Sequence, residues 1–192
     1  MRNLGIVLIG ALLTFNAGAQ AFQNKTNVIT LGLGLDPYYK HVNIVAPNYR
    51  KSAIGPIMLT YERGVTELLG IGRIGAGGGI GQSFYTTKWT DNNYNNYDRT
   101  SRTAIFARAA YHFDFGIEKL DVYAGVGGGV YIDNTTRVRE NGFVASKATT
   151  TSPKGGPDVF GGVRYYFTNA FGVYGEVGYG ISAISGGFAF KF

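Results

Sequence analysis

The sequence contains no cysteine, which excludes disulfide scaffolds, thiolate metal sites, cysteine nucleophiles and a lipoprotein anchor. Only two histidines, His41 and His112, are present. We place them at opposite ends of the expected fold, so they are not expected to share a metal site or a catalytic dyad. Charged residues are also scarce, at 16% of the chain against roughly 25% in soluble globular proteins. The chain therefore has few charges with which to cover a water-facing surface.

Glycine and aromatic residues are abundant in the sequence, whereas charged residues and proline are scarce. The 192 residues include 30 Gly, 14 Tyr and 13 Phe but only 5 Pro, and the mean hydropathy is close to zero. Such a composition suits pleated strands whose lipid-facing and lumen-facing residues alternate, as in a membrane β-barrel. The net charge is +6, but the Lys and Arg residues are scattered rather than gathered in a patch. We therefore expect no nucleic-acid partner.

The first residues have the pattern of an export signal. Arg2 supplies a positive start, residues 4–15 are largely apolar, and Ala17-Gly18-Ala19 matches the small-residue pattern of a cleavage site. The apolar stretch is too short for a transmembrane helix, which needs about 20 residues. We expect residues 1–19 to be a cleaved signal peptide, with cleavage after Ala21 as an alternative, and residues 20–192 to be one barrel domain of net charge +5.

From residue 20 onward the dominant signal is alternation of apolar with small or polar residues. The alternating runs are separated by connections that are short and long in turn, which is typical of a transmembrane barrel. The pattern predicts an all-β fold, an eight-stranded antiparallel up-and-down transmembrane β-barrel. An even number of strands places both ends of the chain on one side of the membrane. The predicted strands are 27–35, 54–62, 69–85, 102–115, 121–133, 158–167, 170–180 and 185–192.

Charge shows which face of each strand turns inward. Arg or Lys on the lipid side near the midplane would cost about 2–4 kcal/mol, so charges well within strands should face the lumen. We expect Glu62 to pair with Arg73 across the first tight turn, and Arg108, Arg164 and Glu176 to form a second cluster. A structural plug is favoured over a proton path or a gate, because eight strands leave little room inside. The predicted lumen cluster is Glu62, Arg73, Arg108, Arg164, Glu176 and Lys191.

Two motifs of possible chemical meaning are rejected or kept only as alternatives. Residues 70–75 match the G-x-G-x-x-G pattern, but an alternating strand follows where a nucleotide site needs a helix N-terminus. His41 with Asp36 is the only candidate for a lipid A-modifying enzyme with a surface histidine. His112 beside Asp114 is interpreted as a satisfied lumen or rim residue.

The long loops carry basic residues that suit the phosphates of lipopolysaccharide. A solvated loop surface explains them equally well. The possible lipopolysaccharide contacts are Lys40, Arg50, Lys51, Arg137, Arg139 and Lys147, with Lys154 beside them.

The last eight residues, Ser185-Gly186-Gly187-Phe188-Ala189-Phe190-Lys191-Phe192, resemble the C-terminal assembly signal of outer-membrane barrels. The positions that match are Ser185, Gly187, Phe190 and Phe192. With segments such as 56–64 (PIMLTYERG) and 163–167 (VRYYF), residues 22–192 resemble the outer-membrane β-barrel domain family of porin-like and opacity-like proteins, in a form typical of Bacteroidetes. The resemblance implies an outer-membrane location and recognition by the barrel-assembly machinery, and it supplies no common catalytic residues.

We therefore expect a non-enzymatic outer-membrane protein with a structural or surface-interaction role, a largely plugged lumen and outward loops. The alternatives are a narrow pore for small solutes and a lipid A-modifying enzyme. No catalytic residue, metal or cofactor is expected. The partners expected are outer-membrane lipid, lipopolysaccharide and the assembly machinery, with a monomer as the favoured state, and the sequence names no ligand or receptor.

Overall fold

A computed structural model describes residues 21–36, 48–91, 94–141 and 144–192 of the chain, and the side chains of residues 91, 140–141 and 144–145 are not described. The expected signal peptide, Lys40 and His41 lie outside the described residues. In the described ranges no helix is long and apolar enough to cross a membrane.

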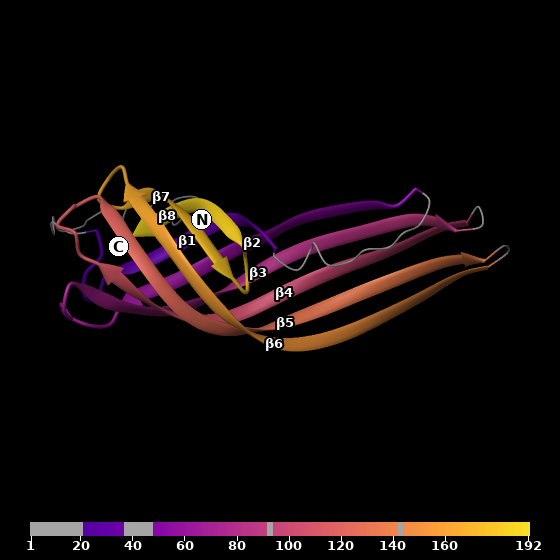
Figure 1. The fold of residues 1–192 in the computed structure, drawn as a ribbon, viewed down its shortest axis with the longest axis horizontal. Helices are drawn as coiled ribbons and strands as arrows, with labels where there is room; N and C mark the ends of the chain where they lie inside the picture. The colour runs from indigo at the N-terminus through magenta and orange to yellow at the C-terminus, as the bar shows by residue number, and fades with distance from the viewer. Residues whose placement is uncertain (1–20, 37–47, 92–93, 142–143) are drawn as a thin grey trace, which may run out of the picture.

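Eight antiparallel strands follow one another along the chain and close into a ring (Figure 1). Each strand pairs with its neighbours in sequence, and the last pairs with the first. This confirms the expected all-β, eight-stranded antiparallel order. The strands are β1 (Asn27–Leu35), β2 (Arg50–Gly64), β3 (Gly72–Asp91), β4 (Tyr94–Phe113), β5 (Leu120–Asn141), β6 (Val144–Tyr166), β7 (Phe171–Tyr179) and β8 (Ile184–Lys191).

The ring closes between β1 and β8, as the sequence predicts. The register runs from Val28 opposite Lys191 to Leu35 opposite Ile184. Beyond the strand, the backbone N–H of Asn27 donates to the Phe192 carbonyl and the N–H of Phe192 donates to the Asn27 carbonyl, both at 2.9 Å. The seam therefore extends to the last residue of the chain. We call this end of the ring, where β1 begins and β8 ends, the terminal end.

Five of the eight strands continue past the ring at the opposite end. β1, β7 and β8 have eight or nine residues each, whereas β3 to β6 have at least twenty. The outer parts of β2 to β6 remain paired and form a curved sheet that projects beyond the other three strands (Figure 1). We call this sheet the extension, residues 50–53, 85–91, 94–101, 133–141 and 144–152.

The extension corrects the sequence prediction, in which residues 86–101 and 134–156 fall in the long connections between predicted strands. Nearly all of these residues lie in two long hairpins, β3–β4 and β5–β6. The hairpins are rich in Thr, whose branched side chain favours strands, and hydroxyl pairs cross between strands. Thr100 contacts Thr135 at 2.9 Å, and Thr151 donates to Asn134 at 2.7 Å. Because both faces are polar, this sheet lacks the apolar alternation on which the prediction relied.

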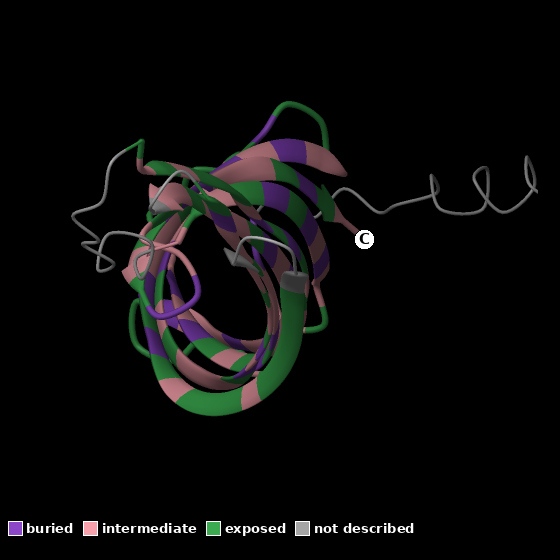
Figure 2. Ribbon diagram, turned by 90° about the vertical axis from the view of Figure 1, so that its right-hand side faces the viewer, coloured by how far each residue is buried: buried purple, intermediate pink, exposed green. Residues whose placement is uncertain are grey.

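The outward face of the ring is mainly apolar on every strand, and its polar residues Gln82 and Thr103 are hydrogen-bonded to each other at 2.8 Å. Alternating residues along the strands are exposed, and the end view in Figure 2 shows exposed residues recurring around the ring. These exposed apolar side chains form a belt around the ring, which we call the apolar belt. One residue from each strand, with 46% to 62% of its surface exposed, represents it. These are Leu31, Leu59, Ile80, Ile105, Val126, Val159, Val177 and Phe188.

The inward face combines large aromatic rings with glycines that leave space for them. Tyr123, Tyr166 and Tyr174 are buried. A Cβ atom added at Gly162 would lie 2.7 Å from the Tyr123 ring and from Glu176 Cγ, so this position accepts only glycine without displacing its neighbours. The lumen is thus filled largely by side chains, as expected for eight strands.

Candidate functional site

Charged side chains gather inside the ring, and the most buried group is centred on Arg164 of β6. Arg164 Nη2 donates to Glu62 Oε2 at 2.5 Å and Nη1 donates to Asp121 Oδ2 at 3.1 Å. The same two carboxylates hold His112, with Nδ1 2.7 Å from Asp121 and Nε2 2.8 Å from Glu62. We call Glu62, His112, Asp121 and Arg164 the His112 cluster. Both nitrogens of the His112 ring therefore face carboxylate oxygens, and two basic side chains lie between two acidic ones.

A second group lies beside the first and is centred on Arg108 of β4. Arg108 Nε donates to Asp158 Oδ2 at 2.6 Å, and Nη1 lies 3.0 Å from Glu176 Oε2. Its guanidinium also lies 3.7 Å from the centre of the Phe160 ring, a cation–π contact. Tyr123 donates to Glu176 at 2.8 Å and lies under the Arg164 guanidinium at 4.4 Å. We call Arg108, Asp158 and Glu176 the Arg108 cluster, and Tyr123 connects it to the His112 cluster.

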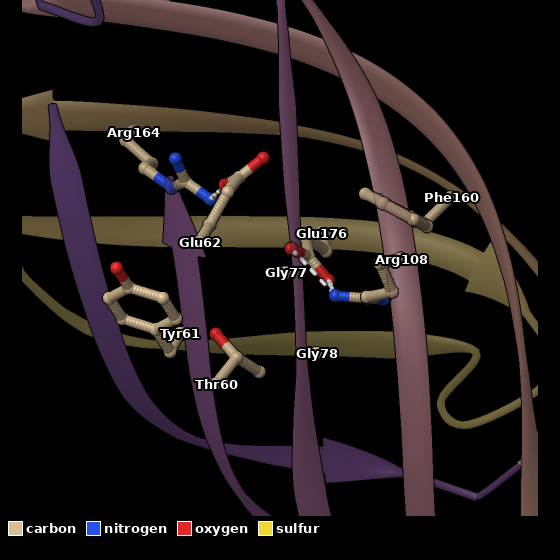
Figure 3. A pocket seen from close by; sticks show the side chains of 9 residues that line it. All are labelled: Thr60, Tyr61, Glu62, Gly77, Gly78, Arg108, Phe160, Arg164 and Glu176. Atoms are coloured by element: carbon tan, nitrogen blue, oxygen red, sulfur yellow. Dashed lines mark hydrogen bonds and ion pairs between the residues drawn. The ribbon is translucent and has the colours of Figure 1, made fainter. Parts of the chain in front are cut away.

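The two clusters leave little free space between them. A cavity of about 20 Å³ is lined by Glu62, Arg164, Arg108 and Glu176, among others (Figure 3). That volume accommodates about one water molecule and no organic substrate. In the described ranges no group of His, Asp and Glu side chains is arranged to hold a metal ion. The arrangement therefore supports rigid closure of the lumen better than it supports chemistry.

The N-terminal residues cover the terminal end of the ring. Ala21 and Phe22 are buried, and the Phe22 ring stacks on His112 with centroids 3.7 Å apart and planes inclined by 10°. The backbone N–H of Lys25 donates to the Gly64 carbonyl at 2.9 Å and fixes this segment to β2.

A third group closes the lumen where the ring meets the extension. Arg102 forms a bidentate ion pair with Asp133, in which Nε donates to Oδ1 at 2.6 Å and Nη2 donates to Oδ2 at 3.0 Å. It also reaches Asp36 at 3.2 Å, and Tyr85 donates to the same carboxylate. Asp36 is thus engaged with Arg102 and Tyr85, and its expected partner His41 lies outside the described residues.

The expected pairing of charges is corrected by these contacts. Glu62 does not pair with Arg73, because its strand partner is Gly77 and its carboxylate is held by Arg164 and His112. Arg73 instead contacts Asp114 at 2.9 Å. Arg108 and Glu176 do pair, but Arg164 belongs to the His112 cluster. Lys191 lies apart from these pairs, with its ammonium 4.5 Å from the centre of the Tyr166 ring.

Sequence reasoning missed several carboxylates that complete the clusters, Asp121, Asp133 and Asp158. All three lie at or near the ends of predicted strands, and only charges well within strands were assigned to the lumen. Extending the inward and outward alternation to the strand ends would have placed these three carboxylates in the lumen. Asp121 and Asp133 share a face with the inward Tyr123 and Tyr131, and Asp158 shares a face with the inward Phe160.

The basic residues proposed for lipopolysaccharide separate onto two faces of the extension. Arg50 and Lys147 lie on the outward face, which continues the apolar face of the ring. Lys51, Arg137 and Arg139 lie on the inward face, where Arg139 Nη1 contacts Asp98 at 2.6 Å and its guanidinium lies 4.4 Å from the Trp89 ring centre. Lys154 approaches Asp133 at 3.9 Å. Lys40 falls outside the described residues.

The residues of the expected assembly signal occupy β8 and its end. Ser185 is buried and pairs with Gly34 and Glu176 across two strands. Gly187 packs against β1, opposite Gly32. Phe190 faces outward and contacts Phe171 at 5.1 Å between ring centres, while Phe192 completes the seam with Asn27.

Comparisons with known proteins add no identification to this geometry. A comparison with protein-family models finds no match, and a comparison with curated protein sequences finds none either.

Proposed function

We propose that the chain is a non-enzymatic outer-membrane β-barrel whose sealed ring spans the lipid and whose extension projects outward as a surface for interaction. The observation that carries the proposal is the contrast between the two faces of the ring. A continuous apolar belt faces out, and paired charges fill the inside. A protein in water has the opposite arrangement, with apolar side chains in its core and charges on its surface.

The height of the belt suits a membrane. On β5 the outward residues are apolar or glycine from Val122 to Ile132, about 33 Å along a strand that rises about 3.3 Å per residue. At the tilt of about 40° common in barrels, this corresponds to about 25 Å along the axis, which matches the apolar band of outer-membrane barrels. The next two outward residues past Ile132 are Asn134 and Thr136, which suit water or headgroups.

Aromatic residues border the belt at the terminal end. Tyr111 contacts Phe113 at 5.1 Å, and Tyr165 contacts Phe167 at 5.6 Å. Tyr and other aromatic rings are enriched at membrane interfaces, where their polar edges reach the headgroups. This border supports a periplasmic position for the terminal end, with the extension on the cell exterior.

The sealed lumen supports a structural role over conduction. An ion entering the ring would have to displace Arg164 from two carboxylates or Arg108 from two more, and breaking a buried pair is costly. Phe22 covers one end, and the contacts of Arg102 close the other. The resemblance of residues 185–192 to an assembly signal supports delivery by the barrel-assembly machinery. The ring itself closes without an unpaired strand edge, whereas β6 pairs with β7 only from Val159 onward, so the edge of the extension is open.

The distribution of charge supports an outward working surface. Ten Lys or Arg and five Asp or Glu fall in the segments 36–53, 84–103 and 132–154, whereas the rest of residues 20–192 carries seven of each. The whole net charge of +5 therefore belongs to the segments that form or adjoin the extension. A positive surface of this kind favours anionic partners.

Planar-bilayer recording tests the sealed lumen. We expect the purified protein to give no stable unitary current, with an inserted large porin as the positive control for sensitivity. The Phe22→Ala variant should also stay silent, because both charge clusters remain in place. Reproducible unitary currents from the wild-type protein would contradict the sealed lumen and favour a narrow pore.

A further inference from the structure

The outward face of the extension carries cations without described anions. Arg50 of β2, Lys88 of β3 and Arg99 of β4 are exposed and lie on this face. We call them the outer basic triad. Every acidic side chain that the structure describes in or beside the extension, Asp36, Asp98 and Asp133, lies on the inward face, where each has a basic partner.

The members of the triad are close neighbours. Arg50 and Lys88 are direct partners in the β2–β3 register, which places their Cβ atoms about 5 Å apart. Lys88 is opposite Tyr97, and Arg99 follows Tyr97 by two residues on the same face of β4, within diagonal reach. Like charges directly opposite each other destabilise a sheet, and no ion pair with a described residue relieves them. A bound anion would relieve this repulsion.

The triad lies on the same face of β2 to β4 as the apolar belt, and the paired Ser52 and Thr86 lie between Arg50 and Lys88 and the exposed pair Ile54 and Phe84. Ile54 follows Arg50 by four residues on β2, and Phe84 precedes Lys88 by four residues on β3. Ile54 and Phe84 are both exposed, and they pair with each other. Four residues span about 13 Å of strand, so a lipid whose acyl chain lies against Ile54 and Phe84 has its headgroup beside the triad.

We propose that the outer basic triad binds the phosphate groups of a phosphorylated glycolipid in the surrounding leaflet. Arg and Lys form charge-assisted hydrogen bonds with phosphate, and Arg can form two at once. The exposed apolar pair Ile54 and Phe84 on the same face favours a lipid-borne phosphate over a free ion. The proposal rests on the outward orientation given under Proposed function and names the partner of that surface. The proposal narrows the basic residues expected from the sequence to contact lipopolysaccharide to a group of three. Two of these, Lys88 and Arg99, were not among the residues expected from the sequence.

The test uses the full mature chain in detergent with lipopolysaccharide as the probe, and native mass spectrometry to measure bound glycolipid. We expect the wild-type protein to retain lipopolysaccharide and to lose it when the probe is enzymatically dephosphorylated. The triple variant Arg50→Gln, Lys88→Gln, Arg99→Gln should bind about tenfold more weakly or worse. Raising the salt concentration should weaken wild-type binding, because exposed charges are screened.

A matched control removes three cations from the terminal end, with Lys25→Gln, Arg63→Gln and Lys119→Gln. These residues are also exposed, so the net charge changes equally while the outer face stays intact, and binding should be retained. Heat-dependent migration on gels verifies that both triple variants are folded. Equal binding of dephosphorylated probe, unchanged binding by the first variant, or equal loss in the control would overturn the proposal.

Two further results distinguish a lipid-borne phosphate from a free phosphate ion, and a failure of the triad proposal from a failure of the proposed function. Inorganic phosphate at the same phosphate concentration should not displace the glycolipid, and displacement would overturn the lipid-borne assignment. If the triple variant binds glycolipid normally while the apolar belt contacts acyl chains, only the proposed role of the triad is wrong. If the belt does not contact lipid, the proposed function itself fails.

Discussion

Replacing Arg164 by Met is expected to lower the free energy of unfolding by about 3–5 kcal/mol. Arg164 is nearly inaccessible, with a side chain 3% exposed, and it neutralises Glu62 and Asp121, which are 12% and 1% exposed. Methionine fills similar volume but leaves two carboxylates inside the ring facing one histidine. Urea-induced unfolding of the protein in phospholipid vesicles measures the change.

Arg63→Met is the matched control for this variant. Arg63 adjoins Glu62 on β2, but it is exposed and has no ion pair with a described residue, so the same substitution should cost within about 0.5 kcal/mol. Adding Glu62→Gln to Arg164→Met should restore part of the loss, because one uncompensated charge is removed. Equal stability of the Arg164 and Arg63 variants would show that the His112 cluster contributes no more than a surface charge.

Replacing Val126 by Arg is expected to cost about 2–4 kcal/mol in lipid vesicles. Val126 is 61% exposed at the middle of the belt, and its strand neighbours Ala109 and Val159 share its outward face. In water an exposed valine accepts arginine with a change of about 0.5 kcal/mol or less. A large cost therefore reports contact with hydrocarbon rather than loss of packing.

Thr136→Arg is the control on the same strand and the same face. Thr136 lies ten residues beyond Val126, in the extension, and contacts Thr149 at 3.3 Å. We expect its replacement to change stability by less than about 1 kcal/mol, measured in the same unfolding assay. If the two arginines cost the same, the belt does not face lipid.

The ring could be predicted from sequence because its two faces differ in chemistry. Alternation from Asn27 to Leu35 and from Ser185 to Phe192 predicted the two strands that close the seam, and the structure pairs them. The extension could not be found in this way. Its strands are polar on both faces, so apolar and polar residues do not alternate along them. The sequence feature that favours strands there is the content of β-branched residues such as Thr135, Thr136 and Thr149.

The charged lumen was only partly predictable. The inward face of each strand follows from local alternation, so the positions of Glu62, Arg108 and Arg164 were within reach. Which charges meet depends on the register and stagger of strands far apart in sequence. Glu62 and Arg164 are 102 residues apart, and their contact across the ring requires the closed structure. The short turn between β2 and β3 suggested Arg73 instead, which contacts Asp114.

The central claim is that the apolar belt touches lipid, and tryptophan quenching by brominated acyl chains tests it most directly. In a Trp89→Phe background, which removes the only native tryptophan, Val126→Trp and Thr136→Trp each place one reporter on the outward face of β5. We expect brominated phospholipid to quench the reporter at position 126 strongly and to leave the one at position 136 almost unchanged. Equal quenching at both positions, or none at position 126 in folded protein, would contradict it.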